Sequence, residues 1–155
     1  MTNNITTSQI FKVKLGDSTT TDEIVQALHK EGRYVEGHIT QKNFPLKPHA
    51  IENVEIEIID PGSEFSEDEG LEFLEAAGLE YPTYEHALRF AEQHGRTTTD
   101  KKPYVFFLHE PWLDLNRNRR TVFIDRDLGS CELSLSRPGT GFSVDCVLAG
   151  VRRRK

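Results

Sequence analysis

The 155-residue chain has only two cysteines, Cys131 and Cys146. Two are too few for the disulfide framework of a small secreted domain, and they do not stand at a metal-binding spacing. No run of residues approaches the ~20 apolar residues of a membrane-spanning helix. Residues 1–5 lack the basic and apolar segments that begin a signal peptide. The sequence therefore predicts a soluble cytoplasmic protein with no membrane segment.

Catalytic motifs are also scarce. The 11 glycines stand singly, so the chain has no glycine-rich phosphate loop. Neither cysteine stands at a helix start or beside a basic cluster, and no serine can be matched to a base. The six histidines are scattered, with no pair at metal-ligand spacing. They are His29, His38, His49, His86, His94 and His109. We therefore predict no catalytic residue, no cofactor and no metal site.

The charge is distributed unevenly along the chain, although the net charge is only −6. Residues 1–100 carry 8 Lys/Arg against 19 Asp/Glu, a balance of −11, and residues 101–155 carry 11 against 6, a balance of +5. Either the two parts attract each other within one fold, or the basic part attracts an anionic partner or orients self-association. The candidate polyanion-binding residues are Arg117, Arg119, Arg120, Arg152, Arg153, Arg154 and Lys155.

Residues 114–118 raise the question of a cation site. Asp114, Asn116 and Asn118 place oxygen ligands at alternate positions, as a calcium loop does, and Asp125 falls at the twelfth position. Arg119 stands where a calcium loop has its turn glycine, and neighbouring arginines repel a cation. A plain hairpin loop explains the Asp and Asn residues equally well, so the sequence leaves cation binding open.

Three segments have the apolar periodicity and the end signals of helices. They are residues 21–31, the segment from Ser66 to Gly78, and the segment from Pro82 to Gly95. Thr20 with Glu23, and Ser66 with Glu69, have the spacing of capping boxes at the first two helix starts. We therefore expect three helices with defined starts.

Alternating or apolar segments predict the strands. They are residues 11–15, 54–58, 103–109, 120–126, 131–136 and 142–150. This order predicts the α+β class, with an antiparallel sheet of about four C-terminal strands plus N-terminal strands and two to three helices on one side. We expect a disordered N-terminus over 1–8, one domain over 9–151 and a basic tail over 152–155. The expected core includes Ile56, Leu88, Val144 and Phe106 or Phe107.

The last two predicted strands read as a hairpin turning around Pro138 and Gly139. Paired positions in an antiparallel hairpin have a constant sum, so this register places Cys131 opposite position 146 or 147 and close to Cys146. We predict two neighbouring thiols on the buried face, and the sequence leaves open whether they are reduced or form a disulfide.

Several short motifs carry a family resemblance. They are Gly32-Arg33-Tyr34, Asn43-Phe44-Pro45-Leu46, the acidic strand 54–58, Ala77-Gly78-Leu79, Tyr81-Pro82-Thr83, the strand 103–108 and the ending Leu148-Ala149-Gly150-Val151-Arg152. In these motifs the chain from about Glu31 onward resembles an uncharacterised family of small proteins from candidate-phylum bacteria. That family has no assigned activity, so the resemblance implies no functional residue.

A second resemblance concerns the fold. A Pro-Thr pair that opens a helix after a glycine, with several strands after it and an arginine at the end of the last one, is similar to C-type-lectin-like domains of the formylglycine-generating-enzyme type. In that fold the last strand pairs with an early one, here residues 54–59. Glu110-Pro111-Trp112 is similar to the Glu-Pro-Asn motif of calcium-dependent lectins, but the asparagine is absent. The enzyme's paired catalytic cysteines have no counterpart either.

These observations favour a small non-enzymatic binding domain that acts on a protein partner or through self-association. The alternative is a nucleic-acid-associated protein that uses the basic C-terminal sheet and tail. An enzyme comes third, because no set of catalytic roles can be assembled from the residues.

Overall fold

The computed structural model describes residues 6–95, 102–127, 129–137 and 141–152. Its helices are α1 (Thr21–Lys30), α2 (Glu67–Ala76) and α3 (Tyr84–Gln93). Its strands are β1 (Thr6–Asp17), β2 (His49–Asp60), β3 (Leu79–Glu80), β4 (Tyr104–Phe106), β5 (Trp112–Leu113), β6 (Arg119–Arg120), β7 (Val122–Asp125), β8 (Glu132–Leu135) and β9 (Cys146–Arg152). The α+β class is confirmed.

The starts of α1 and α2 follow from their caps. The hydroxyl of Thr20 accepts a hydrogen bond from the Glu23 amide at 3.2 Å, and that of Ser66 accepts one from the Glu69 amide at 3.1 Å. In both cases the glutamate side chain returns a bond to the backbone amide of the cap residue, so both predicted capping boxes are confirmed. None of the helices in the described residues is both long and apolar enough to cross a membrane.

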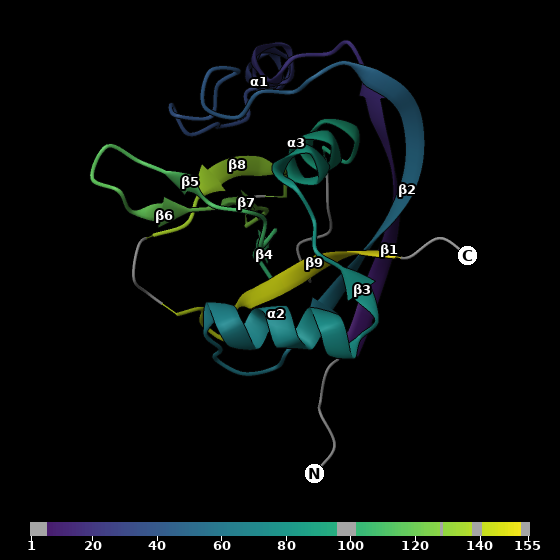
Figure 1. The fold of residues 1–155 in the computed structure, drawn as a ribbon, viewed down its shortest axis with the longest axis vertical. Coiled ribbons are helices and arrows are strands. Elements are labelled where there is room, and N and C mark those ends of the chain that lie inside the picture. Colours follow the sequence, from purple (N-terminus) through teal and green to yellow (C-terminus); the bar gives the residue numbers. More distant parts are fainter. Residues whose placement is uncertain (1–5, 96–101, 128, 138–140, 153–155) are drawn as a thin grey trace.

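One curled sheet contains most of the strands, in the order β1-β2-β9-β4-β7-β8, with β3 paired to the far end of β9 (Figure 1). The pair β4 and β9 is parallel, so the sheet is mixed and the predicted all-antiparallel arrangement is wrong. Strands β5 and β6 form a separate hairpin.

The predicted hairpin between residues 131–136 and 142–150 is also wrong, because β9 lies between β2 and β4 and not beside β8. Cys131 and Cys146 are therefore separated by three strand spacings, on the order of 14 Å along the sheet. Both are free and buried.

Val144, predicted to be in the core, precedes β9 and is 47% exposed. The expected pairing of the last strand with residues 54–59 is confirmed by the register of Ile56 with Val151.

The helices lie on both faces of the sheet, in contrast to the prediction of one side. Val147 and Ala149 of β9 belong to the core layer that contains Leu28 of α1 and Leu88 of α3. The intervening Leu148 packs in the layer under α2, with Leu74. The physical reason is that β9 is apolar at successive positions, so each face of this central strand needs its own cover. Ile56, Leu88, Phe106 and Phe107 are buried as predicted.

The first and last strands in the chain extend beyond the predicted bounds. β1 begins at Thr6, within the segment predicted to be frayed, because β2 is long enough to pair with it from Asp60 onward. Arg152, assigned to the tail, is the last residue of β9 and pairs with Leu79. The other tail residues, Arg153, Arg154 and Lys155, lie outside the described residues.

The burial and the separation of the two cysteines predict how they react with a thiol reagent. Burial raises the pKa of Cys131 to about 11 and also raises that of Cys146, so neither forms a reactive thiolate near neutral pH. With 5,5′-dithiobis(2-nitrobenzoate) at pH 8, we expect slow reaction of the native protein and two thiols per chain after unfolding in urea without reductant. Detection of no thiol after unfolding would contradict this sheet order.

The space around Gly150 indicates how tightly β9 is packed. A Cβ atom at this position would lie 2.8 Å from the Cβ of Leu79 and 2.9 Å from a methyl group of Leu74. We expect Gly150→Ala to lower the free energy of unfolding by about 1–3 kcal/mol, measured by urea denaturation. Gly37→Ala is the matched control, because a Cβ there has no neighbour within 4 Å, and it should leave stability unchanged or slightly higher. Equal effects of the two substitutions would show that the contact with α2 and β3 is not tight.

Candidate functional site

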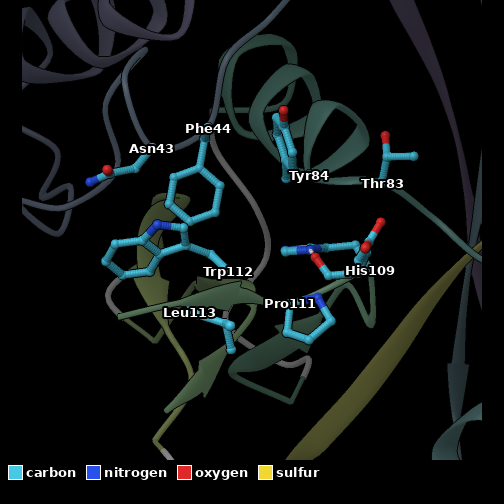
Figure 2. Close-up of a pocket in the computed structure, with 9 residues that line it drawn as sticks. Asn43, Phe44, Thr83, Tyr84, His109, Pro111, Trp112 and Leu113 are labelled. Carbon is cyan, nitrogen blue, oxygen red and sulfur yellow. Dashed lines mark hydrogen bonds between the residues drawn. The ribbon is translucent and has the colours of Figure 1, made fainter. Parts of the chain in front are cut away.

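A pocket of about 350 Å³ lies between the connection that follows α1, the start of α3 and the segment that leads into β5 (Figure 2). Most of its lining is aromatic or apolar. The lining residues are Asn43, Phe44, Thr83, Tyr84, His109, Glu110, Pro111, Trp112 and Leu113. Figure 2 shows the rings of Phe44 and Trp112 on one side of the space, with His109 and Pro111 facing them.

The aromatic side chains are held in place by their own segments. The Phe44 amide donates to the carbonyl of Thr40 at 2.8 Å, and the Phe44 carbonyl accepts from the buried hydroxyl of Thr21. The ring of Phe44 then packs edge-on against Tyr84, with centroids 5.3 Å apart, and tilted against Trp112 at 5.5 Å. The Tyr84 hydroxyl donates to the carbonyl of Pro45. The pocket is therefore preformed by contacts among its own walls.

His109 is the buried imidazole of the pocket, and both of its ring nitrogens are engaged. Its Nε2 accepts the backbone N–H of Val122 at 2.9 Å, which assigns the proton to Nδ1, 2.6 Å from the carbonyl of Glu110. Burial lowers the pKa of His109, so the neutral ring is favoured. A general base needs a free lone pair, but the lone pair on Nε2 of His109 already accepts the hydrogen bond from Val122.

The basic residues predicted to bind polyanions do not form one surface where they are described. Arg119 pairs with Glu67 at 3.1 Å, and Arg120 pairs with Asp114 at 3.3 Å. Arg117 lies exposed in the loop between β5 and β6. Arg152 lies between two carboxylates of β2, Glu55 at 3.4 Å and Glu57 at 3.5 Å.

The β5–β6 hairpin and the end of β9 lie at opposite sides of the molecule in Figure 1. Each group has one arginine paired with a carboxylate from the acidic part of the chain, since Glu67 faces Arg119 and Glu55 faces Arg152. This arrangement favours attraction within the fold as the reason for the uneven charge.

Residues 114–118 form a plain hairpin loop, which was the alternative to a calcium loop in the sequence. Oδ1 of Asp114 accepts the amides of Asn116 and Asn118, both at 2.9 Å, and Oδ2 faces Arg120. These donors, the Asn118 amide first, lower the pKa of Asp114. Its oxygens are therefore occupied by donors that a cation would have to displace. Within the described ranges no group of three His, Cys, Asp or Glu side chains could hold a metal ion.

Sequence reasoning did not predict the aromatic pocket. Phe44 and Trp112 lie in stretches without helical or strand periodicity, which gave them no assigned face. The available signal was the presence of large aromatic side chains in irregular segments, where an exposed ring is unusual unless it packs or binds.

Comparison with protein-family models, with curated proteins and with solved structures finds no match to this chain. The two resemblances noted in the sequence remain hypotheses, and the function has to be inferred from the geometry of the site.

The hydrogen bonds of His109 predict a pH dependence of stability. Its native pKa lies below the ordinary value of 6.5, so as the pH falls below about 6.5 the unfolded chain takes up a proton that the native ring does not. The stability conferred by the neutral ring is complete above that pH and is lost as the pH falls toward the native pKa. The free-energy difference between wild type and His109→Asn should therefore be constant above pH 7 and shrink between pH 6.5 and 5.

Urea denaturation at each pH measures this difference. His86 is also buried with a lowered pKa, but it is present in both proteins and cancels in the comparison. A difference that stays constant or grows on acidification would show that the His109 ring is charged in the native state.

Proposed function

We propose that this protein is a small cytoplasmic binding domain, without enzymatic activity, that captures an apolar side chain of a protein partner in the aromatic pocket. The observation that carries the proposal is the convergence of Phe44, Tyr84 and Trp112, from three separate segments, on one cavity. Preformed apolar cavities with a few polar groups at the edge are typical of binding sites.

The size and the chemistry of the pocket support a side chain as the ligand. A volume of about 350 Å³ lies at the lower end of the range for ligand sites and suits one large residue with its flanking backbone. Asn43, Thr83 and Glu110 supply polar atoms at the edge, where a peptide backbone would need them. Aromatic and apolar anchors in such pockets contribute most of the binding energy in protein interfaces.

Two further features support a binding role in a reducing compartment. The engaged nitrogens of His109 make the pocket a poor place for proton transfer. Cys131 and Cys146 are unpaired, as is usual for thiols in the cytoplasm. The nucleic-acid alternative finds no comparable support among the described residues, because Arg119, Arg120 and Arg152 are paired with carboxylates.

Trp112 is the single tryptophan and lines the pocket, so tryptophan fluorescence reports binding there. We expect pentapeptides of the form acetyl-Gly-Gly-X-Gly-Gly-amide to change Trp112 fluorescence saturably when X is leucine or phenylalanine. The same peptides with glycine, glutamate or lysine at X should have at least tenfold weaker effects, because only an apolar side chain gains from burial against the rings.

Two leucines of the same hairpin provide a matched pair of variants. Leu113 lines the pocket, whereas Leu115 lies outside the lining and is 98% exposed. Leu113→Asp should weaken leucine-peptide binding about tenfold or more, and Leu115→Asp, with the same added charge, should leave it within about twofold. Equal losses in the two variants, or no saturable signal with any peptide, would exclude the pocket as the binding site.

A further inference from the structure

The opposite face of the sheet carries a second cavity, of about 580 Å³, over β4 and β7. Tyr104, Phe106, Phe123 and Phe142 contribute four aromatic rings to it, and Asp125 contributes a carboxylate. Its lining residues are all different from those of the pocket in Figure 2. It is therefore a separate site from the one assigned to the apolar side chain.

Strand register brings these side chains together. Tyr104 lies directly opposite Asp125, and Phe106 lies directly opposite Phe123, so all four point to the same face. The rings of Phe106 and Phe123 stack with centroids 4.5 Å apart, and Tyr104 meets Phe123 edge-on at 6.0 Å. Phe142, from the segment before β9, packs edge-on against Phe106 at 4.7 Å. Only Phe106 among the four is buried, so the other three rings keep part of their surface open to a ligand.

Asp125 supplies a carboxylate beside Tyr104 in this aromatic cluster. Burial and then the carboxylates of Asp125, Asp127 and Asp145, in that order, raise the pKa of Tyr104. Lys102, the nearest lysine in the chain, is held by Asp60 at 2.9 Å. The carboxylate that strand register places beside Tyr104 is that of Asp125.

Arg137 also lines the cavity. Asp125 pairs with Glu132 in the register of β7 and β8, and Arg137 follows Glu132 by five positions along the chain. At ~3.3 Å for each extended residue, its backbone lies roughly 16 Å from the row that contains Tyr104 and Asp125. The backbone of Arg137 is therefore well separated from the row that contains Asp125.

Aromatic faces and carboxylates together select an organic cation. The ring faces attract positive charge through their quadrupole, and the carboxylates add a direct attraction. A bare ammonium is strongly hydrated and needs several acceptors to replace its water, whereas a trimethylated ammonium sheds water easily and buries its methyl groups against the rings. We propose that this cavity binds a quaternary ammonium group, carried by a small molecule or by a methylated side chain.

Choline and its neutral isostere 3,3-dimethylbutan-1-ol test the proposal, because they differ only in the charged centre. We expect choline to bind at least tenfold more tightly in an NMR titration at constant ionic strength, with the largest shifts on the rings of Tyr104 and Phe123. Equal affinities, or choline-induced shifts confined to other residues, would overturn it. A pentapeptide with trimethyllysine at its centre separates the sources: tighter binding than choline assigns the group to a protein side chain, and equal binding assigns it to a small molecule.

Three substitutions separate the ring faces from the charge. Phe123→Leu keeps the apolar bulk and removes the ring, and should weaken choline binding about tenfold. Asp125→Asn keeps the shape and removes the charge, and should weaken it several-fold. Tyr34→Phe, at an exposed tyrosine that does not line the cavity, is the control and should leave choline binding within about twofold of wild type. Unchanged affinity in folded Asp125→Asn and Phe123→Leu proteins would exclude the site, and if Phe123→Leu does not fold, Asp125→Asn decides alone.

Discussion

Burial of the C-terminal strand on both faces is the constraint on which the rest of the structure depends. β9 pairs with β2, β3 and β4, and Cys146 through Val151 are all buried. The pairing of β2 with β9 joins residues about 90 positions apart, so the closure that forms the centre of both core layers is entropically costly. The same strand fixes β4, which contributes Tyr104 and Phe106 to the second cavity and is followed by the segment that lines the aromatic pocket.

A buried arginine attaches the helical layer to the edge of this sheet. Nη1 of Arg33 donates to the carbonyl of Ala91 at 2.8 Å, in the last turn of α3, and to the carbonyl of Cys131 at 2.9 Å, just before β8. Nη2 pairs with Glu31 at 2.8 Å. A guanidinium suits this position because it satisfies carbonyls at the negative end of a helix and carries several donors in one plane. The position of α3 sets that of Tyr84 at its start, so this contact also supports the wall of the aromatic pocket.

The parts of the fold that sequence could predict are those whose signals are local. The caps at Thr20 and Ser66 set two helix starts, and the alternation of Ile56 with its acidic neighbours identified β2. The strand order is different, because residues 146–151 are apolar at successive positions and contain no alternation from which a single partner or face can be assigned. The predicted hairpin between residues 131–136 and 142–150 followed from their proximity in sequence, but the corresponding strands β8 and β9 are not neighbours in the sheet. The aromatic pocket could not be predicted for a related reason: its walls come from segments far apart in the chain and without periodicity.

Charge along the chain and charge at the surface also differ, and the difference bears on what each cavity can bind. Residues 101–155 carry an excess of positive charge, yet Asp125 of that same stretch lies directly opposite Tyr104. Meanwhile Arg119 is paired with a carboxylate of α2, in the acidic part of the sequence. Folding thus pairs charges from the two parts of the chain, with an apolar pocket on one face and an aromatic cavity lined by Asp125 and Arg137 on the other. Since electrostatic attraction is screened beyond roughly 10 Å, the local charges and not the net charge of −6 decide which ligand each cavity selects.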